Sequence, residues 1–302
     1  MSSTINNVSS TGYGYSTIVH ELGHALGLKH PFEGEHQLPS DVDNTTHSVM
    51  SYTASSNIKI DFTIKDDGGI NAKYHYIYPE LYALYDISTL HTLYGANETT
   101  NGEENHYHFN FNNFTFSTIW DSGGNDTIDL STTQGNSSID LNGGSINSID
   151  VYTKEEIIKF YQEEVSLSYY NDWIASLVED LDAKNMLYTG KDNVSIAEGV
   201  IIENIIMGSG NDILEDNRVD NIIDMGAGDD NIYMGAGGYD TLDGGEGNDT
   251  LYLNLSSIDS FTLKNYKEVY LLYTDTYGIE FKNIELIVLE DGSSFYPEDI
   301  LS

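Results

Sequence analysis

The residues that most clearly suggest a chemical function lie close together near the start of the chain. His20 and His24 are four residues apart, and Glu21 directly follows the first of them. Residues four apart share one face of a helix, so a helix here would present both imidazoles to one metal ion. A catalytic zinc ion typically has three protein ligands and an open position for water. The pattern therefore predicts part of a zinc site, with Glu21 as the general base that takes a proton from water.

Two further features complete this prediction. Gly27 can end the helix in a left-handed turn, which lets His30 fold back as the third ligand. This extended pattern is far more specific than the first five residues alone. The later segment Ser48-Val-Met50-Ser-Tyr52 adds a methionine whose thioether can form a soft floor beneath the imidazoles. Met50 alone would be read as ordinary core, and Tyr52 is placed to turn its phenol towards the metal.

These motifs resemble the serralysin branch of the metzincins, a family of zinc endopeptidases. The resemblance rests on the zinc-site pattern with Pro31, on SVMSY at 48–52, and on the segments 84–97 and 118–129. It covers most of the chain outside the stretch 153–187. The family implies that peptide bonds are hydrolysed by zinc-activated water. It also implies that Tyr52 is both an additional zinc ligand and a catalytic residue that hydrogen-bonds the transition state.

A repeat begins at Met207. Asp212, Asn221, Asp230, Asp240 and Asp249 recur at steps of 9, 9, 10 and 9 residues, and each is followed two residues later by Leu or Ile. The fixed phase of the aliphatic residues argues against a disordered Gly/Asn-rich tract. A nonapeptide repeat of this kind predicts a parallel β-roll whose aliphatic side chains stack inwards.

Glycines and carboxylates in these turns predict several calcium sites, because hard cations take carboxylate and carbonyl oxygens. The glycines allow tight turns that expose backbone carbonyls. The predicted calcium residues are Gly208, Gly210, Asp212, Gly226, Gly228, Asp230, Gly235, Gly237, Asp240, Gly245, Gly247 and Asp249, with Asp121 and Asp126 as an upstream turn. Two irregularities could each cost a site: the turn 216–221 lacks glycine and carries Asn at the carboxylate position, and a ten-residue step precedes Asp240.

The overall charge agrees with cation binding. The chain has 12 basic and 49 acidic residues, a formal net charge of −37, and no cysteine. This acidic field disfavours nucleic acid and anionic membranes, and it opposes folding until cations bind. A purely solubilising surface is the alternative interpretation. Without cysteine, no disulfide framework or thiolate metal site can form.

Local patterns predict the remaining elements. Alternation of polar and apolar residues favours short strands over 107–150. Thr153 and Glu156 form a capping-box pattern before two helical stretches within about 153–187. These stretches are interpreted as two amphipathic helices that pack on a neighbour, with a partner-binding hairpin as the alternative. A helix is also expected from about Pro79 to Tyr94, ended by Gly95.

The expected fold class is α+β. Residues 1–106 would be the C-terminal part of a metzincin catalytic domain, mainly helical, with the zinc helix and Met-turn. Residues 107–302 would be a serralysin C-terminal RTX-type β-roll and sandwich with the helical insertion. A serralysin catalytic domain has a sheet-bearing half before its zinc helix, and Met1 lies only 19 residues before His20. The N-terminal half of that domain is therefore expected to be absent from these residues.

Two main functions follow as hypotheses. The first is a secreted zinc metalloendopeptidase that acts on protein or peptide substrates. The second is a catalytically impaired, calcium-binding secreted RTX module or gene fragment with a residual zinc site, and an adhesin or surface-layer component is a third. The N-terminal residues lack the pattern of a signal peptide, and no run of 18 apolar residues could span a membrane. The resemblance implies type I secretion to the extracellular space, and we expect a monomer.

Overall fold

The computed structural model describes residues 12–109 and 116–300, and the chain forms two compact units. The first unit comprises residues 1–96, 114–118 and 151–195, and the second comprises 97–113, 119–150 and 196–302. The two units interleave along the sequence, so the predicted division between residues 106 and 107 stays a prediction. Within the described residues, no helix is both long enough and apolar enough to cross a membrane.

Two helices of the first unit frame the segment that is predicted to bind metal. Helix α1 (Tyr13–Ala25) ends just before Gly27, whose φ of +94° is left-handed, as predicted. Helix α2 (Leu84–Tyr94) begins five residues later than expected, and Gly95 follows its end with a φ of 82°. Pro79 instead lies in an isolated bridge with Phe116. The later start is set by Asp86, whose carboxylate accepts the backbone N–H of Ala83 at 3.0 Å.

The structure does not support a mainly helical region over residues 1–106. A β-hairpin lies between the two helices: β1 (Ile58–Ile64) pairs antiparallel with β2 (Ile70–Tyr76), in register from Ile58–Tyr76 to Ile64–Ile70. Long irregular segments surround it. The alternating sequence IKIDFTI, followed by Asp67-Gly68-Gly69, is the signal that would have predicted this hairpin.

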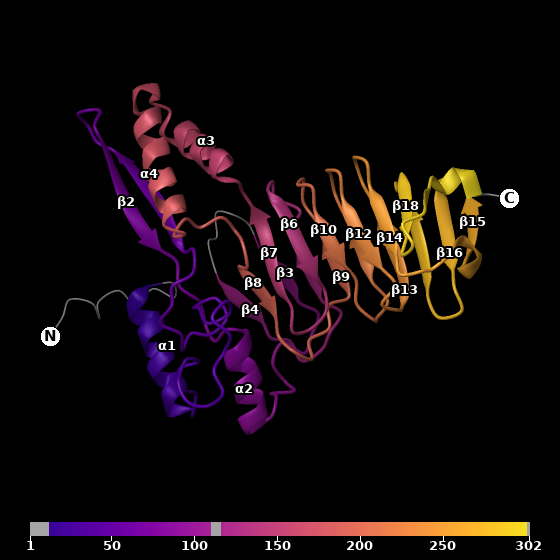
Figure 1. Ribbon diagram of the computed structural model, residues 1–302, viewed down its shortest axis with the longest axis horizontal. Helices are drawn as coiled ribbons and strands as arrows, with labels where there is room; N and C mark the ends of the chain where they lie inside the picture. Colours follow the sequence, from indigo (N-terminus) through magenta and orange to yellow (C-terminus); the bar gives the residue numbers. More distant parts are fainter. Residues whose placement is uncertain (1–11, 110–115, 301–302) are drawn as a thin grey trace. The chain divides into compact units, whose positions relative to one another are not determined.

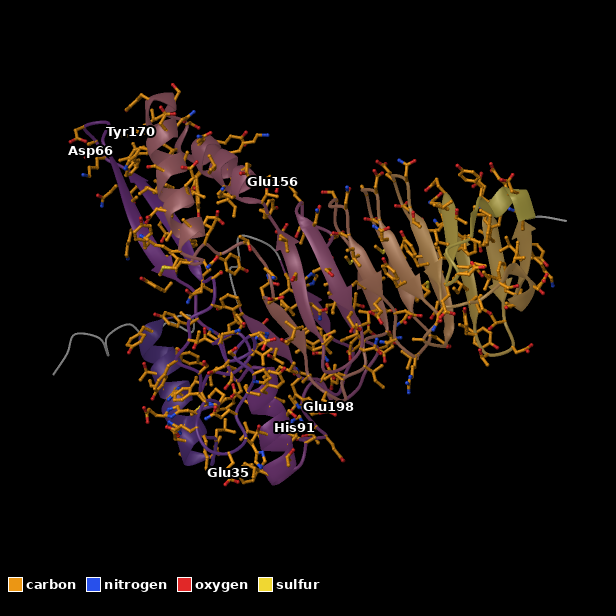
Figure 2. All side chains as sticks on the ribbon, viewed as in Figure 1. Glu35, Asp66, His91, Glu156, Tyr170 and Glu198 are labelled. Atoms are coloured by element: carbon orange, nitrogen blue, oxygen red, sulfur yellow. The ribbon has the colours of Figure 1, made fainter. Side chains whose placement is uncertain are left out.

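The predicted helical pair packs on this hairpin (Figure 1). Helix α3 (Lys154–Val165) has the predicted capping box, because the Thr153 hydroxyl accepts the Glu156 N–H and the Glu156 carboxylate accepts the Thr153 N–H. A 3₁₀ turn, η2 (Ser168–Tyr170), leads into α4 (Asn171–Ala183); Figure 2 labels Glu156 and Tyr170 at these helix starts. The Tyr161 hydroxyl accepts the N–H of Ile60 at 3.0 Å. The helices therefore cover part of the hairpin, as the interpretation of amphipathic helices predicted.

The second unit contains two sheets, which we call sheet 1 and sheet 2. Sheet 1 has the strand order β15-β16-β17-β13-β11-β9-β5-β3, and sheet 2 contains the order β19-β18-β14-β12-β10-β6-β7. Strands β4 (Ser117–Ile119) and β8 (Val194–Ile196) lie at the boundary between the units. The strands of sheet 1 are β3 (His106–His108), β5 (Thr127–Asp129), β9 (Asn204–Ile206), β11 (Ile222–Asp224), β13 (Tyr239–Asp243), β15 (Thr262–Tyr266), β16 (Val269–Tyr273) and β17 (Gly278–Lys282). Those of sheet 2 are β6 (Asn136–Asp140), β7 (Ile146–Val151), β10 (Ile213–Glu215), β12 (Asn231–Met234), β14 (Thr250–Leu253), β18 (Leu286–Leu289) and β19 (Ser294–Phe295). Two further 3₁₀ turns, η3 (Ile258–Ser260) and η4 (Pro297–Ile300), complete the described part.

From β9 to β14 the chain alternates between the two sheets (Figure 1). Each strand pairs in parallel with the next-but-one strand along the chain, as Ile213 does with Asn231 and Ile222 with Thr241. The repeated aliphatic residues Leu214, Ile223, Ile232, Leu242 and Leu251 are at most 1% exposed. The predicted parallel β-roll is therefore confirmed, as are short strands in the described part of 107–150. Residues 110–115 of that prediction lie outside the described residues.

Candidate metal centres

Three histidine side chains of the first unit converge on one point. His20 and His24 lie on α1, and His30 lies beyond the left-handed turn at Gly27. The Nε2 atom of His30 is 3.1 Å from that of His24 and 3.3 Å from that of His20. One ligand atom from each residue lies within 4.8 Å of the others. The predicted ligands are thus brought together as a set that suits a single metal ion.

Contacts at the opposite ring nitrogens define how these imidazoles are oriented. The Nδ1 atom of His20 is 2.9 Å from the Val49 carbonyl, and that of His24 is 3.1 Å from the Leu28 carbonyl. For His30, Nδ1 is 3.0 Å from a carboxylate oxygen of Glu33, an ion-pair distance without hydrogen-bond geometry. Oxygens at Nδ1 hold the ring proton there and leave the Nε2 lone pair for a metal. The converging Nε2 atoms therefore form a donor set that fits zinc.

The predicted Met-turn lies beneath α1. Met50 is 1% exposed and packs in a core cluster with Val19, Leu28 and Val49. A Cβ atom added to Gly23 would lie 2.5 Å from the Met50 sulfur. Only glycine at this helical position lets the helix approach the methionine so closely. The thioether thus supports the helix that carries two histidines, while the Val49 carbonyl orients His20.

A buried carboxylate that sequence reasoning missed holds the Met-turn in place. Asp86, 3% exposed in the first turn of α2, accepts hydrogen bonds from the Ser48 hydroxyl and the Val49 N–H, both at 2.7 Å. Burial raises the pKa of Asp86, and these hydrogen bonds partly oppose that shift. A lone acidic residue on an apolar helix face, as in Leu84-Tyr-Asp86-Ile, was the available signal.

Glu21 and Tyr52 occupy the exposed side of this centre. Glu21 follows His20 on α1 and is exposed to solvent. Tyr52 is 68% exposed, and its ring centroid lies 4.5 Å from that of His30 and 5.6 Å from that of His20. Ile18 and Leu22 on α1 are each 52% exposed. The predicted fourth ligand, Tyr52, therefore lies beside the triad, and the predicted base, Glu21, is exposed on the helix that carries two of its histidines.

The second unit carries two ladders of polar side chains, one at the entry to each sheet. The sheet-2 ladder consists of Asp212, Asp230, Asp249 and Glu285. Each accepts the backbone N–H of the residue one turn earlier: Ser137 to Asp212, Asp212 to Asp230, Asp230 to Asp249, and Asp249 to Glu285. The sheet-1 ladder consists of Asp126, Glu203, Asn221 and Asp240, with the corresponding bonds from Asn105 to Asp126, Asp126 to Glu203, and Asn221 to Asp240.

The aspartates of both ladders share an unusual feature. In each, Oδ1 accepts a backbone N–H, while the buried Oδ2 has no hydrogen-bond partner; these residues are Asp126, Asp212, Asp230, Asp240 and Asp249, all at most 2% exposed. Burial raises the pKa of Asp230 and of Asp240 to about 7, and those of Asp212 and Asp249 to about 6. A buried, unpaired carboxylate oxygen is costly unless a cation or proton meets it. The donor chemistry therefore fits a hard cation such as calcium.

Glycines bring successive turns close enough for this arrangement. A Cβ on Gly228 or Gly245 would lie 2.0 Å from the carbonyl oxygen of the glycine one turn earlier, and on Gly247 only 1.8 Å. The predicted residues Gly208, Gly210 and Gly226 show the same close approach, at 2.1, 2.4 and 2.2 Å from the nearest oxygen. Gly235 and Gly237 lie in the turn between β12 and β13, where the spacing is wider. A Cβ added there would lie 3.2 and 3.4 Å from the nearest atom of a neighbouring turn.

Asp121 differs from the other predicted calcium residues. It is 2% exposed, but both oxygens have partners: Oδ1 accepts the Gly123 N–H and Oδ2 accepts the Tyr107 hydroxyl. Burial, and then the hydrogen-bonded Asp121 carboxylate, raise the pKa of Tyr107. Sequence reasoning also missed Glu203 and Glu285, because both carry Glu where the repeat carries Asp or Asn and both lie outside the run from Asp212 to Asp249. Glu203 lies nine residues before Asp212, and each Glu is followed two residues later by Ile, which was the available signal.

Comparison with known proteins places this architecture in a family. Residues 83–155 and 182–283 match the family described as Peptidase M10 serralysin C terminal. The chain is 36% identical over 230 residues to Serralysin C of Dickeya chrysanthemi, covering 70% of this chain and 38% of that protein. It is 35% identical over 231 residues to a serralysin of Photorhabdus sp. (strain Az29), and 34% over 232 residues to one of Proteus mirabilis; these alignments cover 69% and 70% of this chain, and 38% and 37% of those proteins.

This chain belongs to the serralysin C-terminal family of peptidase family M10. It spans about two fifths of the length of the serralysins that it matches. The matched segments leave out residues 156–181, which contain most of the α3–α4 pair, and they begin after the histidine triad.

Proposed function

We propose that the chain is part of a secreted, serralysin-type zinc metalloendopeptidase that hydrolyses peptide bonds in protein or peptide substrates. Residues 1–106 would contribute the zinc helix and Met-turn, and 107–302 the β-roll domain with its helical insertion. The convergence of three Nε2 lone pairs, from His20, His24 and His30, carries this proposal. These three residues would hold zinc, with Tyr52 as an additional ligand.

Zinc, when bound, would supply a Lewis acid that polarises a peptide carbonyl and acidifies a water molecule. The side chains of the chain do the rest. Glu21, next to His20 and exposed on the same side, would take the proton from the attacking water and deliver it to the leaving amine. The Tyr52 phenol, within ring contact of His30, would donate a hydrogen bond to the developing oxyanion.

The β-roll would bind several calcium ions at its buried aspartates. The predicted glycines would expose the carbonyls that complete each site, and Asp121 would contribute to the upstream turn. Since five aspartates carry an unpartnered buried oxygen, calcium binding would contribute directly to folding stability. This coupling suits a protein that folds after type I secretion into an extracellular space where calcium is plentiful.

A calcium-binding module with a residual zinc site is the second candidate. Exposure of Ile18 and Leu22 beside Glu21 favours it, because an endopeptidase cleft needs walls around its zinc helix. In the first candidate, further protein would cover this face of α1. The two candidates therefore differ in activity, and they agree on the calcium-bound roll.

Cleavage of casein by protein purified with zinc and calcium tests the proposal. We expect activity in the wild type and loss of at least about a thousandfold in Glu21→Gln, because the water loses its general base. Glu35→Gln removes the same charge from the loop after His30 and should retain activity. Zinc content should stay near one per chain in both variants and fall in His24→Ala. Zinc-loaded, folded wild type that cleaves nothing would reject the first candidate and favour the second.

A further inference from the structure

One position of the sheet-1 ladder carries an uncharged side chain. Asn221 stands where the other repeat positions carry an aspartate, and it is 1% exposed. Its backbone N–H donates to Asp240 as the ladder requires. Its side chain behaves differently from those of the aspartates, since it donates hydrogen bonds towards the preceding turn.

The amide of Asn221 occupies the gap between its own turn and the preceding one. Its Nδ2 lies 3.1 Å from the carbonyl oxygens of both Ile202 and Glu203. A second buried amide, that of Asn217, donates to the same Ile202 oxygen at 2.8 Å and to Leu141 at 3.3 Å. Backbone carbonyls that could face a cation are therefore already satisfied by side-chain N–H groups.

We infer that the Asn217 and Asn221 amides close this gap without a cation, so that calcium binds only at gaps faced by an aspartate. Calcium takes six to eight oxygen ligands with a net negative charge among them. At this gap the carbonyls of Ile202 and Glu203 point at N–H hydrogens. The Asn221 Oδ1 has no hydrogen-bond partner but carries no formal charge, so its burial costs much less than that of an aspartate. This inference rests on the proposed calcium-binding roll.

The other irregularity of the repeat does not remove a site. Asp240 follows the ten-residue step, yet its Oδ1 accepts the Asn221 N–H and its Oδ2 is buried without a partner, as in the regular turns. The extra residue is accommodated at Gly237 and Gly238, both with positive φ. Residue type, rather than repeat length, therefore decides which gaps take calcium.

Native mass spectrometry at controlled free calcium tests the inference. We expect Asn221→Asp to bind one calcium ion more than the wild type, because a carboxylate would face the carbonyls of Ile202 and Glu203 in place of an N–H donor. Asn265→Asp adds the same charge on β15, away from both ladders, and should leave the number of bound ions unchanged. An unchanged ion count in folded, calcium-loaded Asn221→Asp would overturn the inference.

A second pair of variants covers the case in which Asn221→Asp does not fold. Asn221→Ala should bind as many calcium ions as the wild type but melt at a lower temperature, since the two hydrogen bonds from its side-chain amide are lost. Asp240→Ala should bind one ion fewer. Loss of an ion in Asn221→Ala would show that Asn221 is itself a ligand and would contradict the inference alone. Wild type that binds no calcium would instead contradict the calcium-binding roll, and the inference with it.

Discussion

The histidine triad and the carboxylate ladders both gather metal-ligating side chains, but they differ in what they require before a metal arrives. In the triad, His20 and His24 contact backbone carbonyls and Glu33 lies beside His30. In the ladders, five buried aspartate oxygens have no partner. Imidazoles supported in this way lower the folding stability little when no metal is bound. Buried unpaired carboxylates lower it by several kcal/mol each. The comparison teaches that zinc would serve chemistry here and calcium would serve folding.

Calcium removal should have the largest effect of any single change. We expect chelation at pH 7.5 to abolish cooperative unfolding of the second unit, because the ladder carboxylates repel and lack counter-ions. Removing zinc should leave that transition unchanged. The two tryptophans lie in different units, Trp120 in the second and Trp173 in the first. Tryptophan fluorescence of the Trp173→Phe variant therefore reports unfolding of the roll alone. Equal melting temperatures of the roll with and without calcium would contradict the proposed difference between the triad and the ladders.

Acidification should partly replace calcium in the metal-free protein. Burial raises the pKa of Asp230 and of Asp240 to about 7, above the value of about 3.9 expected for an unfolded chain. A raised carboxyl pKa favours folding when the group is protonated, so this stability is fully present below about pH 3.9 and is lost as pH rises from there to about 7. We expect the metal-free roll to show a cooperative melting transition at pH 5 that it lacks at pH 7.5.

The calcium-loaded protein provides the control for this pH effect. Protons and calcium compete for the same aspartate oxygens, so acidification should weaken calcium binding and lower the melting temperature of the loaded roll. Melting curves of both forms across this range would show slopes of opposite sign. Parallel slopes would mean that the ladder aspartates do not control the stability of the roll.

Gly245→Ala tests the close stacking of turns. The new Cβ would lie 2.0 Å from the Gly226 carbonyl oxygen at a φ of +93°. Gly292→Ala is a matched control, because it has a φ of +83° but open space around the Cβ. The control should lose about 1 kcal/mol from backbone strain, and Gly245→Ala about 2 kcal/mol more from the clash. Denaturant unfolding of the calcium-loaded protein measures both, and equal losses would contradict the close approach.

Asp86→Asn should have the smallest effect, and it acts on the triad. The amide cannot accept from the Ser48 hydroxyl, the Val49 N–H and the Ala83 N–H as the carboxylate does. Displacement of Val49 would disturb the carbonyl that orients His20, and we expect zinc affinity to fall about tenfold. Asp66→Asn at the hairpin tip, labelled in Figure 2, removes the same charge and should bind zinc normally. Competition with a zinc chelator measures the difference, and equal affinities would show that Asp86 does not support the triad.

Much of this arrangement could be predicted from sequence, because the patterns are local or periodic. The spacing of His20, His24, Gly27 and His30 reflects one helix and one turn, and the structure brings the ligands together. The phase of the ladder aspartates reflects the repeat of the roll. Asp86 could not be assigned in this way, since its partners Ser48 and Val49 lie far along the chain. Glu203 and Glu285 share the phase of the repeat but carry Glu in place of Asp. The β1–β2 hairpin was missed although its alternation and turn were visible, because a helical interpretation of the whole region took precedence.

Anomalous scattering at the zinc absorption edge, from crystals of the zinc- and calcium-loaded protein, tests the central claim most directly. We predict one strong peak within ligand distance of the Nε2 atoms of His20, His24 and His30, and no zinc peak at the ladder aspartates. Absence of a peak at the triad in zinc-loaded crystals, or a zinc peak elsewhere instead, would contradict the account.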